Sequence, residues 1–139
     1  MIEVELLGGG LAERGAHGTA DVSAQELGRL CELCAERLGV EDGHVAVEFV
    51  SEDRITELNA THRGLREPTD VLSFPIDGAA PLAGEAPREL GDIVICAQHT
   101  ADLREAVVHG MLHLLGMDHE QDEGEMLALQ CELLISGGR

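Results

Sequence analysis

Residues 109–119 read HGMLHLLGMDH, which places three histidines at the spacing H-x3-H-x2-G-x2-H. His109 and His113 are four residues apart, so on a helix both imidazole rings project from one face. Gly116 predicts the end of that helix, because glycine readily adopts the left-handed conformation found at helix C-termini. The resulting turn is expected to bring His119 to the same face. We therefore predict one transition-metal site, with zinc as the simplest choice, held by His109, His113 and His119.

Other interpretations of these histidines stay open. They are also compatible with buried rings that carboxylates satisfy, although a largely apolar helix offers few such partners. A structural zinc would need a fourth ligand, for which Cys96 and Asp118 are candidates, whereas three protein ligands leave a position for water, as in catalytic sites. An ion of that kind acidifies water and polarises phosphoryl oxygens. The spacing equals that of metzincin proteases, H-E-x-x-H-x-x-G-x-x-H, but Gly110 replaces their catalytic glutamate, which argues against ordinary metzincin proteolysis.

The segments around this stretch alternate between strand and helix patterns. Strands are predicted over about residues 1–7, 44–50, 71–75 and 90–96, and helices over about 23–39, 52–62, 101–115 and 122–135. The first helix opens on a capping box, Ser-Ala-Gln-Glu, and the polar or Gly- and Pro-rich segments 8–22 and 77–89 are predicted loops. Helices and a mixed sheet in 139 residues predict a single domain of the α/β or α+β class.

The charge of the chain limits its partners. Its net charge is −18, and all nine basic residues are arginine. Such a chain repels a polyanion, so a nucleic-acid function needs a local positive patch, a metal ion or a helper protein. No apolar run approaches the roughly 20 residues that span a bilayer, and the N-terminus lacks the pattern of a secretory signal. We expect a cytoplasmic protein with no membrane partner.

The four cysteines do not form a convincing metal or disulfide framework. Cys31 and Cys34 make a CxxC pair, but no second pair follows. They share one helix face with Leu27, Leu30 and Leu38, which predicts small core residues, with redox or zinc chemistry as the alternative. Cys96 and Cys131 are interpreted in the same way.

Three blocks of sequence resemble the YbeY family of ribosomal RNA maturation factors. The histidine segment is similar to the family signature H-G-x-L-H-L-x-G-[YF]-D-H and departs from it only at Met117. Residues 63–75, RGLREPTDVLSFP, are similar to R-G-x-x-x-P-T-D-V-L-S-F-P, and residues 90–95, LGDIVI, to L-G-D-I-x-I. In order and spacing the blocks cover about residues 40–135, most of the chain.

The resemblance implies a zinc-dependent single-strand endoribonuclease that acts in 16S ribosomal RNA maturation and ribosome quality control. It maps the three zinc ligands onto His109, His113 and His119, and the family's arginine near the metal onto Arg63. The implied partners are single-stranded ribosomal RNA and small-subunit ribosomal proteins, with no DNA substrate. The implied fold is one α/β domain over residues 1–139, with a four-stranded, mostly parallel sheet that has one antiparallel strand and is packed with helices.

Roles for individual side chains follow from this implication as hypotheses. Arg63 and His113 are the expected catalytic residues: the guanidinium stays charged and forks onto two phosphate oxygens, while the ion polarises the phosphodiester or activates its attacking oxygen. The alternative for Arg63 is a structural contact at a helix end. Asp70 and Asp92 either orient ligands or belong to turns. The acids that flank His119 either shuttle protons or are simply solvated. The rival functions are another metal-dependent hydrolase, such as a protease, and a non-catalytic, zinc-stabilised ribosome-assembly factor.

Overall fold

A four-stranded mixed sheet forms the centre of the computed structural model, which describes residues 2–8, 23–77, 88–118 and 120–137. The strands are β1 (Ile2–Leu7), β2 (Gly43–Phe49), β3 (Val71–Pro75) and β4 (Glu89–Ile95), in the sheet order β1-β2-β4-β3. β1 pairs with β2 and β2 with β4 in parallel, whereas β3 runs antiparallel to β4. The predicted sheet, mostly parallel with one antiparallel strand, is confirmed.

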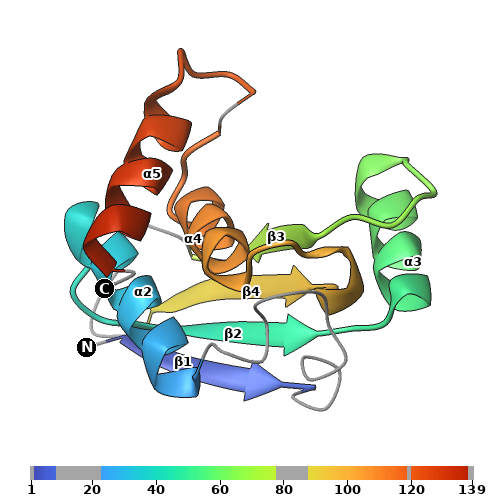
Figure 1. The fold of residues 1–139 in the computed structure, drawn as a ribbon, viewed down its shortest axis with the longest axis horizontal. Coiled ribbons are helices and arrows are strands. Elements are labelled where there is room, and N and C mark those ends of the chain that lie inside the picture. The colour runs from blue at the N-terminus through green and yellow to red at the C-terminus, as the bar shows by residue number, and fades with distance from the viewer. Residues whose placement is uncertain (1, 9–22, 78–87, 119, 138–139) are drawn as a thin grey trace.

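Within the described residues, four α-helices and one short 3-10 helix accompany the sheet (Figure 1). They are α2 (Ala24–Arg37), α3 (Glu52–Arg63), η1 (Ala97–His99), α4 (Leu103–Leu114) and α5 (Glu125–Gly137). All four predicted helices are present; η1 was not predicted, and α5 begins three residues later than expected. Within the described ranges, no helix combines the length and the apolar character needed to cross a membrane.

Local side-chain chemistry sets the helix ends. The Ser23 hydroxyl accepts a hydrogen bond from the Glu26 N–H at 3.1 Å, which confirms Ser23 as the N-cap of α2. The reciprocal half of the predicted capping box is replaced, because the Glu26 carboxylate accepts from the Arg104 guanidinium at 2.7 Å instead. α4 starts at Leu103 rather than at the predicted residue 101, because the Asp102 side chain accepts from the next free N–H groups as its N-cap. The predicted loops 8–22 and 77–89 fall almost wholly outside the described residues.

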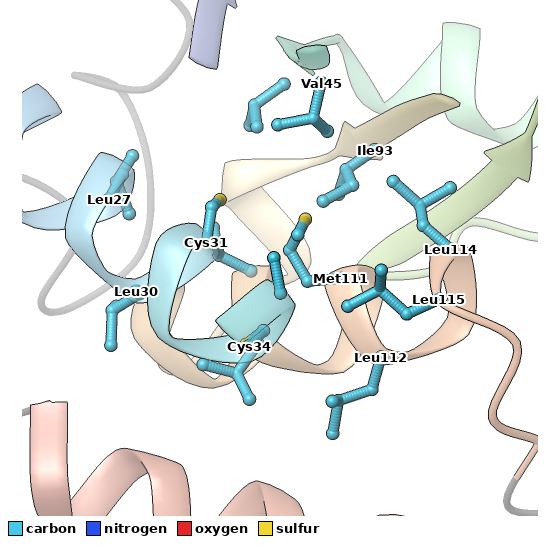
Figure 2. Close-up of a cluster of buried hydrophobic side chains, with 14 of the residues drawn as sticks. Leu27, Leu30, Cys31, Cys34, Val45, Ile93, Met111, Leu112, Leu114 and Leu115 are labelled. Carbon is cyan, nitrogen blue, oxygen red and sulfur yellow. The ribbon is translucent and has the colours of Figure 1, made fainter. Parts of the chain in front are cut away.

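The larger hydrophobic cluster packs α2, α4 and α5 on one face of the sheet. Figure 2 shows its centre, where Cys31 and Cys34 of α2 lie beside Met111 and Leu112 of α4 and Ile93 comes from β4. A smaller cluster packs α3 on the opposite face; its buried members are Val50, Ile55, Leu72, Val94 and Cys96. Successive strand residues alternate between the two clusters, as a pleated strand requires.

The cysteine predictions are confirmed at three positions and wrong at one. Cys31 and Cys34 are completely buried, and burial raises the pKa of Cys34 to about 12 and that of Cys31 further still. Neutral thiols in an apolar core are poor nucleophiles and poor metal ligands. Cys96 is also buried, but Cys131 is exposed on α5 because it faces away from the core.

Candidate metal centre

Helix α4 carries the first two predicted ligands on its one partly exposed stripe. Eight of its residues are buried, among them Val108, Gly110 and Leu112, whereas His109 and His113 are only partly buried. Gly110 lets the helix approach the sheet closely: a Cβ at this position would lie 2.7 Å from the Cγ2 atom of Ile93. The Ser73 hydroxyl of β3 donates to the Gly110 carbonyl at 3.0 Å and fastens the helix to the edge strand.

The two imidazoles meet at their Nε2 atoms. His109 Nε2 and His113 Nε2 are 3.2 Å apart, with the ring planes inclined by 77°. Two nitrogens bound to one tetrahedral zinc ion at 2.0–2.1 Å would lie about 3.3 Å apart. The spacing of this pair therefore fits a shared ion, and neutral imidazole nitrogens are suitable ligands for it.

The turn that follows α4 forms as predicted. Gly116 has φ +102°, and the Met117 N–H donates to the Leu112 carbonyl at 3.0 Å, as in a Schellman motif. His119 lies outside the described residues, so the third ligand stays a prediction. Without it, the described part of the chain contains no group of three side chains able to hold a metal.

A glutamine from α5 contacts the first histidine. Gln130 Oε1 lies 2.8 Å from His109 Nδ1, and the Gln130 side chain is buried with 7% of its surface exposed. Sequence reasoning did not identify this residue. The available signal was that Gln130 is a polar residue on the apolar helix face that Met126 and Leu133 define.

His109 and His113 open into a cleft of about 650 Å³. Its walls are α4, the whole of edge strand β3, the C-terminal end of α3 and the start of α5. Among its described lining residues, Arg63 is the single guanidinium, against five carboxylates: Asp70, Asp102, Glu105, Asp118 and Glu120. Because the cleft is acidic, a phosphate group would enter it poorly without a bound cation.

Arg63 reaches the cleft from the opposite side of the edge strand. It is the last residue of α3, which Gly64 ends in a left-handed conformation with φ +73°. Among the described residues, no hydrogen bond or ion pair holds its exposed side chain. The loop that follows is fixed by buried Asn59, whose amide donates to the Glu67 carbonyl at 2.9 Å. Sequence reasoning missed Asn59 as well, since nothing local marks the asparagine.

The other acidic candidates separate into two groups. Asp70 lines the cleft but also accepts a hydrogen bond from the Val71 N–H at 2.8 Å, so it has a turn role whatever else it does. Asp92 alternates with Ile93, which packs against α4, so the Asp92 side chain faces the other side of the sheet and is not placed to orient a ligand. Asp118 and Glu120 line the cleft.

The structure also argues against two alternatives, a fourth zinc ligand from Cys96 and a protease-like general base at position 110. Cys96 packs in the smaller cluster with Ile55 and Val94, on the far side of the sheet from the histidines, so it is not placed as a fourth zinc ligand. Position 110 points into the sheet at Ile93, so a side chain there has no path to the cleft. The position that carries the metzincin glutamate therefore offers no general base here.

The fold and the cleft define the class of protein: a small α/β protein whose edge strand borders a paired-imidazole centre and one arginine. The comparison with protein families identifies it further. Residues 17–136 match the family model described as endoribonuclease YbeY. The chain therefore belongs to the YbeY family of endoribonucleases.

Individual relatives agree with this assignment. The chain is 40% identical to endoribonuclease YbeY of Bacillus subtilis, over 82% of this chain and 85% of the relative. It is 38% identical to that of Staphylococcus saprophyticus, over 81% and 85% of the two chains. The solution structure of TM1509 from Thermotoga maritima superposes with a TM-score of 0.53 at 28% identity, covering 99% of this chain and 89% of that one.

Proposed function

We propose that this protein is a zinc-dependent, single-strand endoribonuclease that matures 16S ribosomal RNA and serves ribosome quality control in the cytoplasm. The observation that carries the proposal is the shared cleft, which Arg63, His109 and His113 line together, with the Nε2 atoms of the two histidines 3.2 Å apart. Membership of an endoribonuclease family supports the reaction class.

The donor set supports the proposed cation in this cleft. His109, His113 and His119 would hold one Zn²⁺, and bound there it supplies Lewis-acid activation at the scissile phosphate. Neutral imidazoles leave the charge of the ion intact, which offsets part of the negative charge of the five carboxylates around it. A phosphodiester is then attracted to a site that would otherwise repel it.

Arg63 would bind the phosphate from the other wall. A guanidinium stays charged at all relevant pH values and donates two parallel hydrogen bonds to phosphate oxygens. Since the edge strand β3 lies between α3 and α4 at the cleft, a phosphate bound there is bracketed by the arginine and the histidines. We assign Arg63 and His113 as the catalytic residues on this basis.

The proposed partners follow from the same charges. Single-stranded RNA is the proposed substrate, because an unpaired strand can bend into a local cleft while its other phosphates stay away from the acidic surface. Basic proteins of the small ribosomal subunit are the proposed protein partners, since a chain of net charge −18 attracts them. They would also bring the RNA to the enzyme.

The decisive experiment is a cleavage assay on single-stranded RNA with purified protein, with and without a chelator. The His113→Ala variant is the key control, because it excludes contaminating nucleases. The matched control is His99→Ala, which removes an exposed histidine of η1 that does not line the cleft. We expect stoichiometric zinc and cleavage in the wild type and in His99→Ala, and neither in His113→Ala. Retention of stoichiometric zinc by His113→Ala would refute the site.

A further inference from the structure

The contact between α5 and the first histidine has a direct chemical consequence. An amide oxygen accepts hydrogen bonds and cannot donate them, so Gln130 Oε1 at 2.8 Å requires a proton on His109 Nδ1. A neutral imidazole carries only one N–H. His109 Nε2, which faces His113 Nε2 at 3.2 Å, is therefore left with its lone pair.

The position of Gln130 is fixed by the core and not by the cleft. Met126 and Leu133, four residues before and three after it, are buried with it on one face of α5. α5 in turn packs against α4, which carries His109. A buried amide with its helix anchored on both sides holds its oxygen in place at little further entropic cost.

An amide suits this position better than a carboxylate on electrostatic grounds. Either group accepts a hydrogen bond from an imidazole N–H. A carboxylate, however, would place a buried negative charge beside a cleft whose lining already includes five carboxylates. Glutamine supplies the acceptor without that cost.

We propose that Gln130 is a positioning residue that holds the His109 ring in its Nδ1–H tautomer and aims the Nε2 lone pair at the metal. The purpose assigned to Gln130 rests on the proposed zinc site, but the tautomer of His109 can be measured without metal. The alternative is a purely structural hydrogen bond between α4 and α5, with no influence on metal binding.

The tautomer is tested on metal-free protein by ¹⁵N NMR of the histidine side chains, at a pH where imidazoles are neutral. A His109→Gln sample assigns the His109 signals. We expect the Nδ1–H form in the wild type and loss of that preference in Gln130→Met, which keeps the chain length but has no oxygen. A wild-type His109 in the Nε2–H form would overturn the proposal, whether or not the variants fold.

Zinc affinity, measured by competition with a chromophoric chelator, tests the purpose of the contact. We expect Gln130→Met to bind zinc about 10–100-fold more weakly, as is usual when the partner of a metal-bound histidine is lost. Gln130→Glu retains an acceptor and should restore affinity to within about threefold of the wild type. The matched control is Gln98→Met, the same change at an exposed glutamine of η1.

The outcomes separate this proposal from the proposed function. Wild-type zinc affinity in a folded Gln130→Met would mean that the contact is only structural. Failure of Gln130→Glu to recover affinity would also contradict a role as hydrogen-bond acceptor. If the wild type binds no stoichiometric zinc, the proposed function fails together with the purpose assigned to the Gln130–His109 contact. If His109 is in the Nε2–H form and zinc binding is normal, only the role of Gln130 is overturned.

Discussion

Gly110, which lies between His109 and His113 on α4, provides the sharpest test of how closely this helix packs on the sheet. A Cβ added to Gly110 would lie 2.7 Å from Ile93 Cγ2 and 3.3 Å from two further atoms of the same side chain. Ile93 is completely buried, and its branched Cβ restricts its rotamers, so it has little freedom to move aside. Gly110→Ala should therefore push α4 away from β4.

The magnitude follows from two opposing effects. Replacing a helical glycine with alanine stabilises an exposed helix by about 1 kcal/mol through backbone entropy. One extra methyl group in a tightly packed core costs about 1–3 kcal/mol. Gly110→Ala should thus lie between neutral and about 2 kcal/mol destabilising. Gly28→Ala in α2 is the matched control, because a Cβ there meets nothing within 4 Å, and it should be stabilising.

The assay is equilibrium urea unfolding followed by circular dichroism, with the free energies of unfolding compared at equal slope. The expected difference between the two alanine variants is about 1–3 kcal/mol, which is the overpacking term alone. Equal stabilisation by Gly110→Ala and Gly28→Ala would refute the close approach of α4 to Ile93. It would also reopen position 110 to a longer side chain and thus weaken the argument against a protease.

Three further predictions concern single side chains. Arg63→Glu should leave zinc stoichiometry unchanged and abolish RNA cleavage, whereas Arg54→Gln, at the other end of α3, should leave both unchanged; surviving cleavage in the first variant would disprove the role of Arg63. The hydrogen bond to Glu89, opposed in part by burial, raises the pKa of His44 above its usual value of about 6.5. The stability that protonated His44 contributes to the folded protein is therefore complete below pH 6.5 and is lost as pH rises through the folded pKa. His44→Gln should therefore reduce the free energy of unfolding more at pH 6 than at pH 9, and an equal loss at both would contradict the shift. A thiol reagent should modify Cys131 quickly in the native protein and the three buried thiols only on unfolding; fast native reaction of more than one thiol would contradict their burial.

The elements of this protein were predictable because their signals are local. Hydroxyl caps, the glycine that ends α3 and the strand alternation of residues 44–50 act over a few residues, so sequence reasoning placed each element within a few positions. It placed α5 too early because the Asp122 side chain does not lie in the helix: it accepts from the N–H of Gly124, just ahead of α5, and from the N–H of Met126 in its first turn. The unpredicted η1 is a single turn with no side-chain cap, and nothing local marks it.

The site was predictable only in part. The spacing of His109 and His113 on one helix fixes their shared face, and the glycine turn after them formed as expected. Asp92 was a poor candidate for orienting a metal ligand. Its neighbour Ile93 occupies the sheet face that α4 covers, so the Asp92 side chain lies on the other face. Gln130 carried no motif at all and emerged only from the packing of α5.

What the amino-acid sequence determined by itself is therefore the set of helices and strands, the family and the paired imidazoles, since these depend on spacing within one segment. Only the tertiary structure decided that Arg63, the two histidines of α4 and Gln130 share one cleft, because α3, α4 and α5 are brought together there by the strand order that leaves β3 at the sheet edge. Contacts between segments far apart in the chain are set by how the layers pack, and no local pattern encodes that arrangement.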